Sequence, residues 1–158
     1  MTDIKEIYQK LHWENTEQKK QEGMRLARQV EDLSLLLMPP APAYVWICCA
    51  QVLSEKTDSV LEPYLYGLLE WLYDLNWPGA LKVLERLKNF SGEKLKQPFV
   101  DCCTRALQQN NDEGLKWLVG LAELLDNQRL KAQLSKEWIA TLQHKAEDCL
   151  KTDDGSVP

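Results

Sequence analysis

The sequence lacks the patterns on which most catalytic and membrane functions depend. It has no apolar run near the roughly 18 residues that a membrane span needs, and its 7 glycines are too scattered for a phosphate-binding loop or a Gly-x-Ser-x-Gly elbow. The only histidines, His12 and His144, lie at no catalytic or metal-ligand spacing from a cysteine or carboxylate. We therefore expect no catalytic residues, no metal, no cofactor and no membrane partner.

Cysteine is present, but in no pattern typical of a zinc site or a disulfide framework. The 5 cysteines form two adjacent pairs, Cys48–Cys49 and Cys102–Cys103, and a single Cys149. Because the first residues, MTDIKEIYQK, are polar, we expect no signal peptide, reduced thiols and a cytoplasmic location. Adjacent helical residues point in different directions, so each pair is predicted to place one thiol inward and one sideways.

An excess of basic charge is also missing. The chain has 19 Lys and Arg against 24 Asp and Glu, for a net charge of −5. Nucleic acid attracts clustered basic residues, so we expect no nucleic-acid partner. Binding through the face from Lys82 to Lys94 is the least favoured alternative, since Glu85 and Glu93 interrupt it. The acidic balance fits a basic protein partner.

What the sequence does have is helical periodicity, without any alternating, strand-like run. We predict an all-α fold of stacked antiparallel helical hairpins, forming a HEAT-like α-solenoid or superhelix. A length of 158 residues predicts a single domain over 1–150. Within it we expect an N-terminal hairpin at 1–38, a proline-rich connector at 39–42 and a main helical stack at 43–150. Residues 151–158 are predicted to be a flexible tail.

The segment from Glu62 to Phe90 predicts two helices joined by a sharp corner. Its two apolar stripes are Leu65, Leu68, Leu69, Leu72 and Leu75, and then Ala80, Leu81, Leu84 and Leu87. Pro78 suits the first position of a helix and keeps Trp77 out of the α conformation. Asn76 tolerates the left-handed conformation that often ends a helix. We expect only one or two non-helical residues here, as in an αα-hairpin.

Three corner residues are predicted to be structural: Trp71, Trp77 and Pro78. We expect Trp77 to pack against Leu81 in the core, so that Trp77→Ala costs about 3–5 kcal/mol.

The run Glu70-Trp71-Leu72-Tyr73-Asp74-Leu75-Asn76-Trp77-Pro78-Gly79-Ala80 resembles the signature of a small family of uncharacterised bacterial proteins. That family is classed as a domain of unknown function (DUF5071-like), and its distinctive part is Trp-Leu-x-Asp-x-Asn-Trp-Pro. The resemblance extends from about Leu11 to about Leu134. It implies stacked helical hairpins of the HEAT type and implies no particular activity.

The polar side of the first hairpin helix and its corner carries the candidate binding residues, Tyr66, Glu70, Tyr73, Asp74 and Asn76. Glu70 and Asp74 lie four residues apart on one predicted helix face, where Tyr66 and Tyr73 could hydrogen-bond to them. Paired carboxylates can act as general acid and base if burial separates their pKa values, although a solvated surface pair is commoner.

We expect a non-catalytic module that binds another protein, for which a basic partner fits best. The alternatives are a bacterial immunity protein that neutralises a basic toxin domain, and an enzyme that uses Glu70 and Asp74. The oligomeric state stays open.

Overall fold

The computed structural model describes the backbone of residues 3–91 and 93–155 and the side chains of residues 3–91 and 93–148. Over these ranges every regular element is helical and no strand occurs, so the predicted all-α class is confirmed. The α-helices are α1 Ile4–Leu11, α2 Glu17–Ala27, α3 Trp46–Ser54, α4 Asp58–Leu61, α5 Leu65–Glu70, α6 Ala80–Lys88, α7 Lys96–Gln109, α8 Asp112–Ala122, α9 Gln128–Ala132 and α10 Lys136–Gly155. Short 3₁₀ helices are η1 Leu33–Leu36, η2 Ala43–Val45, η3 Glu62–Tyr64, η4 Trp71–Tyr73, η5 Glu93–Leu95 and η6 Glu123–Asp126.

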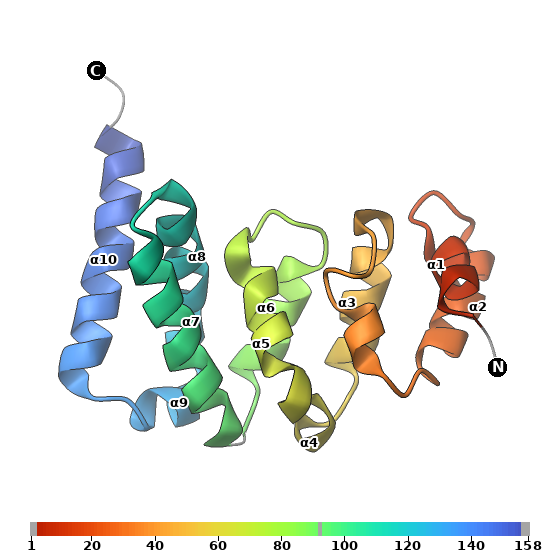
Figure 1. Cartoon of the computed structure of the whole chain (residues 1–158), viewed down its shortest axis with the longest axis horizontal. Coiled ribbons are helices and arrows are strands. Elements are labelled where there is room, and N and C mark those ends of the chain that lie inside the picture. Colours follow the sequence, from red (N-terminus) through yellow and green to blue (C-terminus); the bar gives the residue numbers. More distant parts are fainter. Residues whose placement is uncertain (1–2, 92, 156–158) are drawn as a thin grey trace.

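The helices follow one another in chain order along the long axis of the molecule (Figure 1). Helices α1 and α2 lie at one end, and α10 lies at the other. Neighbouring helices pack together, α1 on α2, α7 on α8 and α8 on α10, while α3 also packs on α6 and α5 on α7. A continuous hydrophobic cluster from Ile7 to Leu142 runs through the whole row.

The two segments predicted to be connector and tail are partly built into this row. Ala41 of the connector is only 3% exposed, and its carbonyl oxygen accepts the indole N–H of Trp46 at 2.7 Å. Helix α10 continues to Gly155, so the first five residues of the segment 151–158 have a helical backbone. The last three residues of the predicted tail lie outside the described part of the chain.

The corner between the two central helices is longer than predicted. Helix α5 and the 3₁₀ turn η4 end at Tyr73, and α6 begins only at Ala80, which leaves six non-helical residues, 74–79. Gly79, with φ of 83°, adopts the left-handed conformation that we had assigned to Asn76. Glycine has no Cβ to clash there, so it is the cheaper choice. Pro78 therefore precedes the helix instead of occupying its first position.

The two corner tryptophans differ in burial. Trp71 is 0% exposed, whereas Trp77 is half-buried and packs its ring on those of Trp46 and Tyr73. The predicted position of Leu81 in the core is wrong, because its side chain is 64% exposed. Val83 belongs to the buried face of α6 in its place, because residues 80, 83, 84 and 87 recur at spacings of three and four and so lie on one side of the helix.

The four cysteines with described side chains are free thiols. Cys49 is buried and Cys48 half-buried, but Cys102 and Cys103 are both fully buried, so the prediction of one inward thiol per pair fails for the second pair. Helix α7 packs against both α5 and α8, which covers two adjacent directions at once. Burial raises the pKa of both Cys49 and Cys102 to about 12. The side chain of Cys149 lies outside the described residues.

Candidate functional site

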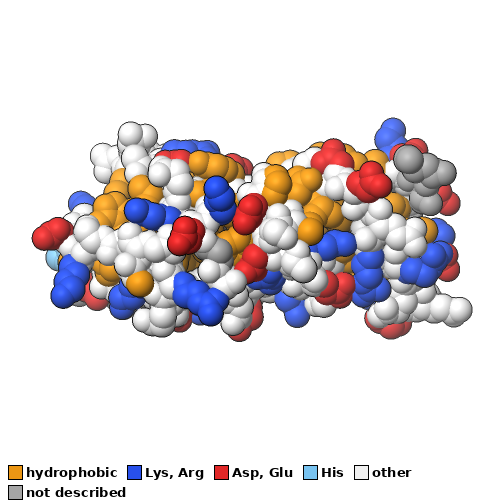
Figure 2. Space-filling view, turned by 90° about the horizontal axis from the view of Figure 1, so that it is seen from below, with side chains coloured by type: hydrophobic (Ala, Val, Ile, Leu, Met, Phe, Trp, Pro, Cys, Tyr) orange, Lys and Arg blue, Asp and Glu red, His pale blue; other side chains and the backbone are white. Residues whose placement is uncertain are grey.

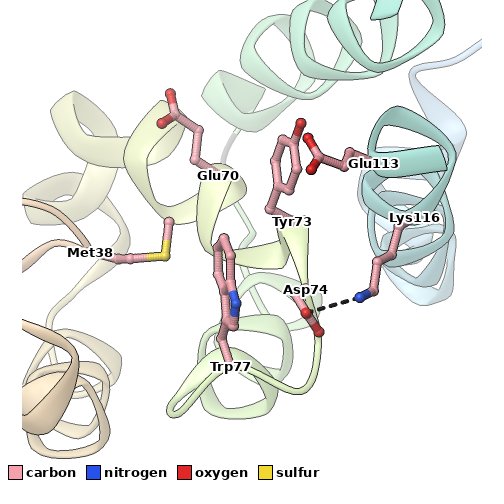
Figure 3. A pocket seen from close by; sticks show the side chains of 7 residues that line it. All are labelled: Met38, Glu70, Tyr73, Asp74, Trp77, Glu113 and Lys116. Carbon is pink, nitrogen blue, oxygen red and sulfur yellow. Dashed lines mark hydrogen bonds and ion pairs between the residues drawn. The ribbon is translucent and has the colours of Figure 1, made fainter. Parts of the chain in front are cut away.

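A pocket of about 390 Å³ opens beside the corner (Figure 3). Its lining comes from the segment before the proline-rich turn, from the end of α5 and the corner, and from the first turns of α8. We call it the corner pocket, and the residues that line it are Met38, Glu70, Tyr73, Asp74, Trp77, Glu113 and Lys116. Helix α8 packs against η4, and this contact brings Glu113 and Lys116 to the corner.

The two carboxylates predicted to form a pair, those of Glu70 and Asp74, each pair with a different cation instead. Asp74 has an extended backbone, with φ of −144° and ψ of 111°, so it does not share a helix face with Glu70 as predicted. Its carboxylate accepts the backbone N–H of Asn76 at 2.8 Å and lies 3.0 Å from the Lys116 ammonium, and these contacts lower its pKa. Glu70 lies 3.6 Å from the Arg105 guanidinium. A carboxylate with a lowered pKa is poorly suited to act as a general acid.

The two tyrosines bond to α7 and not to these carboxylates, contrary to prediction. The Tyr66 hydroxyl donates to Asp101, and the Tyr73 hydroxyl donates to the Gln109 side-chain oxygen at 2.7 Å. The two hydrogen bonds join α5 and η4 to α7. Tyr66 is nevertheless 43% exposed, so part of it remains accessible to solvent.

Aromatic rings continue from the pocket wall into the core. The Tyr73 ring stacks on Trp77 with a centroid separation of 6.1 Å and an interplanar angle of 11°, and on Trp117 at 5.0 Å and 30°. Trp46 extends the line beyond Trp77, with a centroid separation of 5.8 Å. The Arg105 guanidinium lies 5.2 Å from the centroid of the Trp117 ring. We call this line of four rings, Trp46, Trp77, Tyr73 and Trp117, the aromatic row.

The five candidate binding residues are therefore divided between two surfaces. Glu70, Tyr73 and Asp74 line the corner pocket, whereas Asn76 is exposed at the corner and Tyr66 faces Asp101 one turn earlier on α5. Sequence reasoning missed Met38, Glu113 and Lys116, which lie far along the chain and carry no local motif. Of the residues predicted to be structural, Trp71 and Pro78 are joined by a hydrogen bond, and Trp77 forms part of the pocket wall.

The basic face from Lys82 to Lys94 includes cations that are already paired. Arg86 lies 2.6 Å from the Asp58 carboxylate, and Lys88 lies 3.2 Å from that of Asp126. Figure 2 shows one long face of the molecule on which acidic and basic side chains are interspersed, with apolar side chains between them. Such an alternation differs from the contiguous basic stripe that nucleic acid requires.

The described residues contain no group of three or more His, Cys, Asp or Glu side chains that could hold a metal ion. None of the helices in the described ranges is long and apolar enough to cross a membrane.

Comparison with known proteins gives a family and no relative of known function. No curated protein and no solved structure matches the chain. Residues 47–156 match the family described as Domain of unknown function (DUF5071), a stretch that starts and ends later than the resemblance from Leu11 to Leu134 indicated. Because the match covers more than half of the sequence, the chain belongs to the DUF5071 family.

Proposed function

We propose that the chain is a non-catalytic helical-repeat protein, arranged as a short HEAT-like solenoid, that binds another protein at its corner. The helices stacked in chain order support this arrangement (Figure 1). Solenoids commonly bind partners along the extended surface that such stacking creates. The observation that carries the proposal is the corner pocket, where aromatic and acidic side chains from distant parts of the chain meet.

The partner surface that fits this corner is basic. Three carboxylates, those of Glu70, Asp74 and Glu113, line the pocket with the single ammonium group of Lys116. Complementary charge guides encounter and selects partners more than it adds affinity. An immunity protein that neutralises a basic toxin domain is a narrower version of the same proposal.

The same geometry favours binding over catalysis. Asp74 is held by Lys116 and by the Asn76 backbone, and Glu70 is held by Arg105. Catalytic carboxylate pairs have environments that push their pKa values apart, with one raised. The contacts of Asp74 lower its pKa instead.

Affinity capture from the native host tests the proposal. The baits are the wild type, a Glu70→Lys/Glu113→Lys double variant and a Glu93→Lys/Glu147→Lys control, which makes the same charge change at two exposed residues outside the pocket. Asp74 is left intact because it also bonds to the corner backbone. We expect the wild type and the control to retain a partner that the pocket variant loses, and added salt to weaken the retention. If all three baits retain the same proteins, or none retains any, the proposed surface is wrong.

A further inference from the structure

The corner pocket combines two features that suit a planar cation. The nearly parallel rings of Tyr73 and Trp77 form its wall, and carboxylates stand at its rim, as Figure 3 shows. Aromatic faces attract ammonium and guanidinium groups, and Trp attracts them most strongly. A carboxylate beside the ring adds a charge-assisted hydrogen bond.

The protein's own Arg105 already demonstrates this combination at the other end of the aromatic row. Its guanidinium lies over the Trp117 ring, 5.2 Å from the centroid, and one of its nitrogens is 3.6 Å from a Glu70 oxygen. Trp77 stands two rings further along the row. Among the described residues, no Lys or Arg side chain lies over the Trp77 ring, so this position has a ring and carboxylates but no cation stacked on it.

Charge pairing singles out Glu113 as the carboxylate that such a cation would meet. Asp74 is paired with Lys116 and Glu70 with Arg105. Within the described ranges the side chain of Glu113 forms no hydrogen bond and no ion pair, and it is exposed. In Figure 3 its carboxylate lies beside the Tyr73 ring, at the edge of the pocket.

We propose that the corner pocket receives an arginine side chain of the partner protein, with the guanidinium against the part of the Trp77 ring that Trp46 and Tyr73 leave uncovered and hydrogen-bonded to Glu113. This inference rests on the proposed function, because it names the chemistry of the partner. Arginine fits better than lysine because a planar guanidinium both stacks on a ring and binds a carboxylate through two parallel bonds. A volume of about 390 Å³ is ample for one such side chain.

A titration with short peptides tests the pocket without knowledge of the partner. The probes are acetyl-Gly-Arg-Gly-amide and its citrulline counterpart, in which a neutral urea replaces the guanidinium. The indole ¹H–¹⁵N signal of Trp77, assigned by its loss in Trp77→Leu, is followed by nuclear magnetic resonance. We expect the arginine peptide to shift this signal saturably and the citrulline peptide to leave it in place. Equal shifts from both peptides, or no shift from either, would overturn the inference.

Variants then test the assigned carboxylate. Glu113→Gln should weaken binding of the arginine peptide by roughly three- to ten-fold, the range for an ion pair at a pocket rim. Glu93→Gln, which removes the same charge from an exposed position outside the pocket, should bind as the wild type does. Unchanged affinity in Glu113→Gln would contradict the assignment. The amide spectrum of each variant shows whether it is folded, and the comparison of the two peptides on the wild type decides independently of any variant.

The peptide experiment tests the arginine inference and the capture experiment tests the proposed function, so a failure of one can be told from a failure of the other. If no peptide binds at Trp77 while partner capture still depends on Glu70 and Glu113, the arginine inference is wrong and the proposed function stands. If the arginine peptide binds at Trp77 while capture is insensitive to the pocket, the arginine preference stands and the protein-binding function is wrong.

Discussion

Trp71 and Pro78 are joined across the corner by a hydrogen bond, in which the Trp71 indole N–H donates to the Pro78 carbonyl oxygen at 3.0 Å. The Trp71 side chain is fully buried, so this bond anchors the exposed turn to the core. Trp77, between the two, packs against Trp46 and Tyr73. The corner therefore presents the pocket from a fixed backbone, which reduces the entropy lost on binding.

The two corner tryptophans should differ in their effect on stability. Trp71→Ala is expected to lower the free energy of unfolding by about 3–5 kcal/mol, the range for a fully buried large-to-small change. Trp77→Ala should cost about 1–2 kcal/mol, because its half-buried ring loses fewer contacts. Equilibrium unfolding in urea measures both. Equal costs would mean that Trp77 is as much a core residue as Trp71.

At Gly120 the packing leaves no room for a side chain. A Cβ there would collide with the carbonyl oxygen of Leu72, a backbone atom of η4 that cannot move freely. Gly120→Ala is expected to cost about 2–3 kcal/mol through this overpacking. Gly67→Ala is the matched control, because a Cβ there would meet only the flexible end of the Leu37 side chain. Alanine also has a higher helix propensity than glycine. The expectation fails if the two alanines have the same effect on the urea midpoint.

Asp58 links three segments and should make stability depend on acid pH. Partial burial alone would raise its pKa, but the Ser91 N–H and hydroxyl and the Arg86 guanidinium outweigh burial, so the pKa is lowered. A carboxyl with a lowered folded-state pKa stabilises the fold above its ordinary pKa of about 3.9, and this contribution is lost as the pH falls through the folded-state value.

The test compares Asp58→Asn with the wild type. At pH 7 the variant should be about 1–2 kcal/mol less stable, as for loss of charged hydrogen bonds that are partly exposed. Below about pH 4 the difference should shrink, because the wild-type carboxyl becomes protonated. Unfolding at pH 7, 5 and 3 measures it. A difference that stays constant over this range would show that the charge of Asp58 contributes nothing.

The buried thiols should resist alkylation. Burial raises the pKa of Cys49 and Cys102 to about 12 and also raises that of Cys103, so few thiolates exist at pH 8. Iodoacetamide should leave these three unmodified in the folded protein and modify them in urea, as tandem mass spectrometry of tryptic peptides would show. We also expect the unfolding midpoint to be the same with and without reductant. Rapid native-state modification of Cys103 would indicate that α7 opens locally.

Local rules predicted the existence of the corner but not its length. Pro78 and Trp77 do lie in the non-helical corner, as their backbone preferences require, but the first hairpin helix ends at Tyr73, before either of them. Both Asn76 and Gly79 can adopt the left-handed conformation, and local preference alone does not choose between them. In the folded protein the left-handed residue is Gly79, and it follows Pro78, whose carbonyl oxygen accepts the Trp71 indole N–H. Pairing Leu81 with Trp77 across the helix start put Leu81 in the predicted core, but Trp77 lies outside α6, which begins at Ala80.

The sequence by itself determined the all-helical class and most of the buried faces, because helical periodicity is a local property that each segment carries alone. It also grouped Glu70, Tyr73 and Asp74, which share one short segment and all line the corner pocket. Only the tertiary structure decided their partners. Lys116 and Glu113 lie some forty residues from the corner and reach the pocket through the packing of α8 on η4. Arg105 of α7 pairs with Glu70 and not with Asp74, which pairs with Lys116. Such contacts depend on how whole helices pack, and no local spacing encodes that.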